Sequence, residues 1–95
     1  MKFVALIDYV PDPDQQASGF KAHRVYLRGL LEDGRLAGAG VLADAAGAVW
    51  IFDADTAEQA RAVLEADPFY QQGVIERYDL RPLRYWSAQQ ARRAT

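Results

Sequence analysis

The chain has one histidine and no cysteine, so few of its residues could carry acid/base or nucleophilic chemistry. His23 lies in the stretch FKAHRVYLRGLL, where helical spacing places it on the same apolar side as Phe20, Leu27 and Leu30. Two interpretations are open: a histidine at the edge of the core with satisfied nitrogens, or a general acid or base. The second needs a carboxylate or carbonyl partner that fixes the tautomer of the ring.

Asp67 is the partner that we predict for His23. In EADPFYQ it precedes Pro68, as an N-cap does when proline occupies the first position of a helix. A carboxylate has several acceptor sites, so capping a helix and holding a histidine are compatible roles. We therefore expect a catalytic pair of His23 and Asp67, with Phe69 of the same motif in the substrate pocket.

Asp8, Gly38 and Gly40 are further candidates for this pocket. Asp8 lies near the end of a predicted strand, where a solvent-exposed carboxylate is the simpler interpretation. Glycine inside a strand often marks close approach of a ligand or of another backbone. Gly38 and Gly40 could therefore leave the floor of a cavity beneath the first helix, or allow tight packing of helix on sheet. The chain has no second histidine and no ligand-spaced pair, so we expect neither a metal nor a cofactor.

A stripe of cationic residues runs along the same helix beside the histidine. It consists of Lys21, Arg24 and Arg28. A solvated helix face is the simpler interpretation, and steering of an anionic substrate is the alternative.

The pattern of apolar residues predicts four strands and two main helices. The strands are expected at 2–10, 35–43, 48–54 and 74–83, and the helices at 15–33 and after a capping box of Asp55 and Glu58. This βαββαβ order is that of an α+β, ferredoxin-like fold, a four-stranded antiparallel sheet with both helices on one face. We expect one domain, residues 1–83, followed by a tail, residues 84–95.

The first and third predicted strands are apolar on both faces, although two helices can cover one face of the sheet. The other face would leave a larger apolar patch than soluble monomers usually expose. We therefore expect a homodimer of the α+β barrel type, in which the open sheet faces pack together. A cover formed by the tail, with Tyr85 and Trp86, is the alternative.

The composition excludes several classes of function. The 95 residues carry a net charge of −2 without a basic block, and no apolar run is long enough to span a membrane. RNA-recognition domains share the βαββαβ order, but AVWIFDA lacks their aromatic and glycine pattern. Haem binding by a lone histidine is unsupported. The absence of cysteine fits a cytoplasmic protein.

Residues 2–83 resemble the YciI-like (YCII-related) family. The most specific part runs from DADTAEQA through ADPFYQQGV to RPL, with LAGAG in support. The resemblance implies a ferredoxin-like subunit, a homodimer through the sheets, and a pocket in which His23 and Asp67 form a proposed catalytic pair. Members of the family are thought to act on small organic molecules, with dehydrochlorination of an aromatic quinone-type compound among the proposed reactions. Ala39-Gly40-Val41 departs from the family, which tends to have a glycine-proline pair there.

Two functions follow as hypotheses. The first is a small cofactor-independent enzyme that uses the His/Asp pair for elimination, such as dehydrochlorination, or for isomerisation of a small carbonyl-containing or aromatic molecule. The second is a non-catalytic dimer that binds a small ligand in the same pocket or assists an enzyme. Coupling between His23 and Asp67 favours the first hypothesis.

Overall fold

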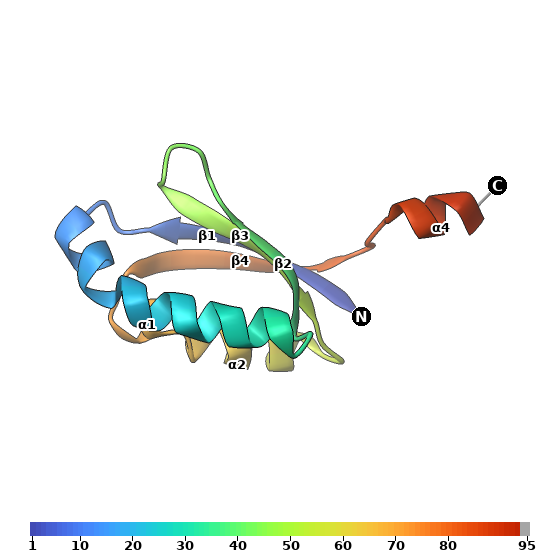
Figure 1. Cartoon of the computed structure of the whole chain (residues 1–95), viewed down its shortest axis with the longest axis horizontal. Coiled ribbons are helices and arrows are strands. Elements are labelled where there is room, and N and C mark those ends of the chain that lie inside the picture. The colour runs from blue at the N-terminus through green and yellow to red at the C-terminus, as the bar shows by residue number, and fades with distance from the viewer. Residues whose placement is uncertain (94–95) are drawn as a thin grey trace.

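A computed structural model describes residues 1–93 of the chain and confirms the predicted ferredoxin-like order. The elements are β1 (Lys2–Tyr9), α1 (Pro13–Glu32), β2 (Leu36–Val41), β3 (Gly47–Asp53), α2 (Ala57–Glu65), α3 (Pro68–Gln71), β4 (Ile75–Leu83) and α4 (Ala88–Arg93). The four strands form an antiparallel sheet in the order β2-β3-β1-β4. Helices α1 and α2 both cover the same face of this sheet (Figure 1).

Alternation along β1 decides which face of the sheet carries the core. Phe3, Ala5 and Ile7 are buried beneath the helices, whereas the side chain of Leu6 is 50% exposed on the other face. Ala5 lies opposite Trp50 of β3, which is also buried. The core therefore lies on the helix-covered face of the sheet, and the site is built on that side.

A tight hairpin joins β2 to β3 and needs glycine at its end. The carboxylate of Asp44 accepts a hydrogen bond of 2.9 Å from the backbone N–H of Ala46, and Ala45 adopts a positive φ of 60°. A Cβ on Gly47 would overlap the carbonyl oxygen of Ile7, so glycine lets β3 pair closely with β1.

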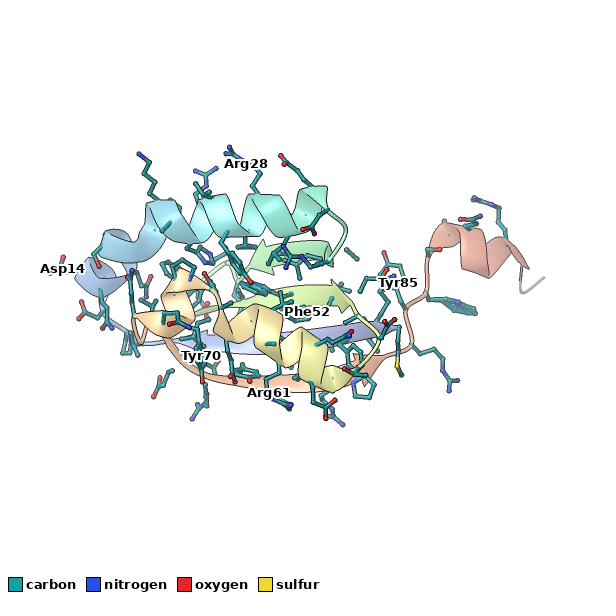
Figure 2. All side chains as sticks on the ribbon, turned by 90° about the horizontal axis from the view of Figure 1, so that it is seen from below. Asp14, Arg28, Phe52, Arg61, Tyr70 and Tyr85 are labelled. Carbon is teal, nitrogen blue, oxygen red and sulfur yellow. The ribbon has the colours of Figure 1, made fainter. Side chains whose placement is uncertain are left out.

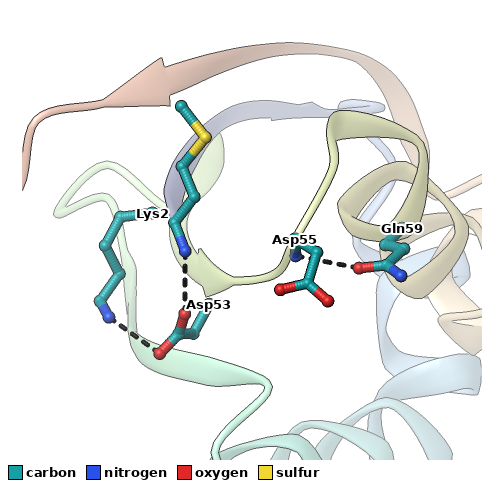
Figure 3. A network of polar contacts seen from close by, with 5 residues as sticks. Lys2, Asp53, Asp55 and Gln59 are labelled. Carbon is teal, nitrogen blue, oxygen red and sulfur yellow. Dashed lines mark hydrogen bonds and ion pairs between the residues drawn. The ribbon is translucent and has the colours of Figure 1, made fainter.

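The start of α2 differs by one residue from the prediction. Thr56, not Asp55, is the N-cap, and its hydroxyl accepts from the N–H of Gln59 at 3.2 Å. The side chain of Gln59 accepts from the N–H of Asp55 at 2.9 Å (Figure 3). The predicted box of Asp55 and Glu58 is wrong because threonine caps as aspartate does and the backbone is still extended at Thr56.

The chain leaves the sheet after Leu83, and α4 projects away from the domain (Figure 1). Trp86 is largely exposed, and Tyr85 contacts Lys2, whose Nζ lies 5.7 Å from the ring centroid. The described part of the tail, residues 84–93, therefore does not cover the open face of the sheet, and the alternative cover by Tyr85 and Trp86 is wrong. Residues 94–95 of the predicted tail lie outside the described residues. Within residues 1–93, no helix is long and apolar enough to cross a membrane.

Candidate active site

Helix α1 presents His23 to the interior of the domain. Asp12 caps the helix, and its carboxylate accepts from the backbone N–H groups of Asp14 and Gln15. The buried residues of α1 are Gly19, His23 and Leu30. Phe20, expected on the same apolar side, is 51% exposed. The inward face is therefore rotated towards Gly19, and Phe20 lies at its border.

Asp67 both caps a helix and contacts His23, the two roles that we expected to be compatible. It is the N-cap of α3, with Pro68 at the first helical position, and its Oδ1 accepts from the N–H of Phe69 at 3.2 Å. Its side chain is fully buried. A buried carboxylate needs compensating donors, and the capped helix supplies one of them.

The second donor to Asp67 is His23, 44 residues away in the chain. The Nδ1 atom of His23 lies 2.8 Å from Oδ2 and 2.9 Å from Oδ1 of Asp67. An ionised carboxylate can only accept hydrogen bonds, so Nδ1 carries the proton and donates the hydrogen bond to Asp67. The lone pair of the neutral ring is then on Nε2, for which no protein partner exists among the described residues. Among the side chains that the structure describes, no fully buried polar atom lacks a hydrogen-bond partner. Nε2 is therefore not fully buried, and it has access to the cavity that His23 lines.

Aromatic rings fix the plane of the imidazole. The Phe69 ring stacks on His23 with centroids 3.9 Å apart and planes 4° apart. Tyr9 meets Phe69 edge-on at 5.6 Å, and Trp50 lies 6.3 Å from His23. Because these rings restrict rotation of His23, its Nε2 keeps one direction into the cavity.

An open cavity of about 420 Å³ lies between α1 and the β2–β3 side of the sheet. Its lining is mainly apolar and aromatic, with one histidine and two arginines: Tyr9, Phe20, His23, Arg24, Leu27, Arg28, Leu31, Ala39, Gly40, Val41, Ala48 and Trp50. This size suits a small molecule. Asp67 is absent from the wall because it is fully buried beside His23.

Tyr9 is a polar residue of the cavity that the sequence did not single out. Burial first, and then the nearby negative charge of Asp67, raises the pKa of its hydroxyl to about 12. The phenol therefore stays protonated at physiological pH and can donate a hydrogen bond to a ligand.

Of the further residues expected in the pocket, Gly40 lines the cavity, whereas Asp8, Gly38 and Phe69 do not. Asp8 is exposed and accepts from the guanidinium of Arg77 at 2.9 Å, and it does not line the cavity. Gly38 and Gly40 are paired with Ile51 and Val49, which belong to the open face of the sheet. Gly40 contributes its backbone to the cavity wall, whereas Gly38 does not. Within residues 1–93, no group of three or more acidic, histidine or cysteine side chains is arranged to hold a metal ion.

Comparison with known proteins agrees with this fold. The 5-chloro-2-hydroxyhydroquinone dehydrochlorinase from Burkholderia phenoliruptrix AC1100, solved with 2,5-dihydroxybenzoquinone, has a TM-score of 0.78 and 19% identity, over 90% of this chain and 96% of that chain. Muconolactone isomerase has a TM-score of 0.72 and 15% identity, over 93% of each chain. No curated protein matches the chain significantly by sequence. The model of the YCII-related domain matches residues 1–84, and the chain therefore belongs to the YCII-related family.

Proposed function

We propose that the chain is a cofactor-independent, homodimeric enzyme that moves protons on small organic molecules. His23 is the general acid/base, and Asp67 holds the ring and balances its charge. The observation that carries the proposal is the buried contact of 2.8 Å between Nδ1 and Oδ2, next to a cavity that His23 lines. A buried carboxylate on one edge of the ring leaves the opposite edge for a substrate.

The proton transfer follows from this geometry. Nε2 of the neutral ring takes a proton from the substrate, and the imidazolium that forms lies against the negative charge of Asp67. In an elimination, the electrons of the broken C–H bond form a double bond and expel the leaving group with its electron pair. In an isomerisation, the same proton returns to another carbon. A positioned base contributes about 10²–10⁴-fold in rate, which suits an activated substrate.

Tyr9 supplies a hydrogen-bond donor to the same cavity. A substrate that loses a proton next to a carbonyl accumulates charge on the carbonyl oxygen. The hydroxyl of Tyr9, with its pKa raised to about 12 by burial and by Asp67, remains a donor for this oxygen. The proposal therefore favours substrates with a carbonyl or a phenolic oxygen.

The structural neighbours support this class of reaction without fixing it. One is named as a dehydrochlorinase and the other as an isomerase, and both names describe proton movement on a small molecule. Loss of hydrogen chloride and migration of a double bond both start from removal of a proton. One acid/base pair could therefore serve either reaction.

The dimer is supported by the open face of the sheet. Leu6 is 50% exposed there, and Val4, Val49 and Ile51 remain partly exposed. A Cβ on Gly38 or Gly40 would meet nothing within 4 Å, so this part of the face is open. A second sheet that packs on this surface would bury the apolar side chains.

Turnover of the compounds that the neighbours' names supply tests the enzyme. Chloride release from 5-chloro-2-hydroxyhydroquinone and isomerisation of muconolactone are measured for the wild type, His23→Gln and Lys21→Gln. We expect His23→Gln to lower kcat by at least about 100-fold. Lys21→Gln, an exposed change two residues away, should have no effect.

Two results would decide against this proposal. Full turnover by His23→Gln would remove His23 from the chemistry. A wild type that turns over neither compound, but binds 2,5-dihydroxybenzoquinone through His23, would instead favour a non-catalytic ligand-binding module.

A further inference from the structure

We infer that Arg24 and Arg28 form a subsite for the carboxylate of the substrate at the mouth of the cavity. The inference rests on the proposed function for its reaction, and it narrows the substrate class to small aromatic or unsaturated carboxylic acids. Both guanidinium groups belong to residues that line the cavity, and no carboxylate lines it with them.

Some basic residues of the described chain are paired with a carboxylate, whereas others, among them Lys21 and Arg81, form no ion pair. Lys2 pairs with Asp53, Arg35 with Asp33, and Arg77 with Asp8. Neither Arg24 nor Arg28 has an ion pair within residues 1–93. The cavity is therefore a locally cationic site on a chain whose net charge is −2.

The spacing of Arg24 and Arg28 on α1 places two like charges side by side. Residues four apart on a helix are neighbours, so the two guanidinium groups repel each other weakly, and a bound anion would relieve this repulsion. Arg24 lies over the ring of Phe20, with 5.6 Å between its Cζ and the ring centroid, which holds it at the mouth. Arg28 extends from the side of α1 that faces away from α2 (Figure 2). Its flexible stem allows the guanidinium to turn towards a bound anion.

The distance along the helix suits a small ring between the two groups. Arg28 is five residues after His23, a rise of about 7.5 Å along the helix axis. A ligand can therefore place its acidic group at the arginines and its reactive carbon near Nε2 of His23. Phe20, Leu27 and Trp50 supply apolar surface to the same cavity.

The surroundings favour a carboxylate over a phosphate. Phosphate sites commonly use free backbone N–H groups at a helix N-terminus or in a turn. Arg24 and Arg28 lie within α1, whose backbone N–H groups are used within the helix. Two planar guanidinium groups beside an apolar wall match a planar carboxylate on an apolar body.

Ligand binding tests the subsite without relying on turnover. Trp86→Phe removes the exposed tryptophan of the two in the chain and leaves Trp50, which lines the cavity, as the fluorescent reporter. In this background, benzoate and phenylacetate are titrated against their neutral analogues benzamide and phenylacetamide. The variants are Arg24→Gln with Arg28→Gln, and Lys21→Gln as the control that removes a charge outside the cavity.

We expect each acid to bind at least about tenfold more tightly than its amide. The double variant should weaken both acids by at least about tenfold and change the amides by less than about twofold, while Lys21→Gln changes neither. Equal affinity for acid and amide, an equal loss in Lys21→Gln, or no binding of either acid at millimolar concentration would overturn the inference. His23→Gln is expected to keep the preference for acids. A failure of the proposed catalysis can therefore be distinguished from a failure of the proposed carboxylate subsite.

Discussion

Gly19 and Phe69 meet where a side chain on the glycine would not fit. A Cβ on Gly19 would lie 3.2 Å from Cδ1 of Phe69 and would overlap the side-chain amide of Gln72. Gly19 is one helical turn before His23, and Phe69 stacks on His23. The bare backbone of α1 at Gly19 therefore lets α3 approach closely enough to bring Asp67 to the imidazole.

Gly19→Ala should change the free energy of unfolding differently from Gly29→Ala in the same helix. Gly29 is exposed, and a Cβ there would meet nothing within 4 Å. We expect Gly29→Ala to raise the free energy of unfolding by about 0.5–1 kcal/mol, because alanine is the better helix former. Gly19→Ala should gain less or lose stability, because Phe69 and Gln72 must move. Urea denaturation measures both, and an equal gain would contradict the close approach.

Asp67→Asn should separate the capping role of Asp67 from its charge. Asparagine is a good N-cap, so α3 should persist, whereas the charge-assisted hydrogen bond to His23 is lost. We expect a loss of about 1–3 kcal/mol in the free energy of unfolding, with a further loss of about 1 kcal/mol in Asp67→Ala.

Nitrogen NMR of the neutral His23 ring tests directly whether Asp67 fixes its tautomer. The wild type should hold the proton on Nδ1, and Asp67→Asn should increase the population with the proton on Nε2. A wild-type ring protonated mainly on Nε2 would argue against Asp67 as the group that fixes the tautomer.

Alkaline pH should destabilise the fold through Tyr9 and Tyr78. Burial is the first cause that raises the pKa of each hydroxyl to about 12. For Tyr9 the second cause is the charge of Asp67, and for Tyr78 it is the hydrogen bond to Glu65. Unfolded tyrosine ionises near pH 10, so the folded state retains protons that the unfolded chain loses. This contribution to stability is complete below about pH 10 and is lost as the pH rises to about 12.

The variant Tyr9→Phe tests this origin of the alkaline transition. Denaturation between about pH 10 and 12 should show a shallower fall in stability than in the wild type. Tyr85→Phe, in the exposed tail, is the matched control and should leave the slope unchanged. An unchanged slope in Tyr9→Phe would contradict the assigned cause.

The sequence predicts the elements and the contact between His23 and Asp67 better than it predicts the cavity wall. Alternation in β1 and the Asp-Pro sequence before α3 are local signals, and both correspond to the observed structure. The topology then brings the two residues together because α1 and α2 lie on the same face of the sheet (Figure 1). The catalytic role of the pair remains a proposal.

Apart from His23 and Gly40, the wall of the cavity could not be predicted, because periodicity does not separate a buried side chain from one that lines an open cavity. Phe20 follows the helical pattern of the core, yet it is half exposed at the mouth. The face of the sheet on which Gly38 and Gly40 lie depends on the pairing of β2 with β3. The register of this pairing shifts between Leu36 and Gly38. Such a shift moves side chains to the other face of the sheet and has no mark in the sequence.

A charge on the open face of the sheet should disrupt the proposed dimer and leave the subunit folded. Leu6→Glu places a carboxylate in the middle of this face, where the wild-type side chain is 50% exposed. Val25→Glu is the matched control, because Val25 is 61% exposed on α1, away from the sheet. Sedimentation equilibrium at micromolar concentration should give a dimer for the wild type and Val25→Glu, and a monomer for Leu6→Glu. A monomeric wild type would rule out the dimer, and a dimeric Leu6→Glu would move the interface to another surface, because burying an unpaired charge between the two sheets would cost several kcal/mol.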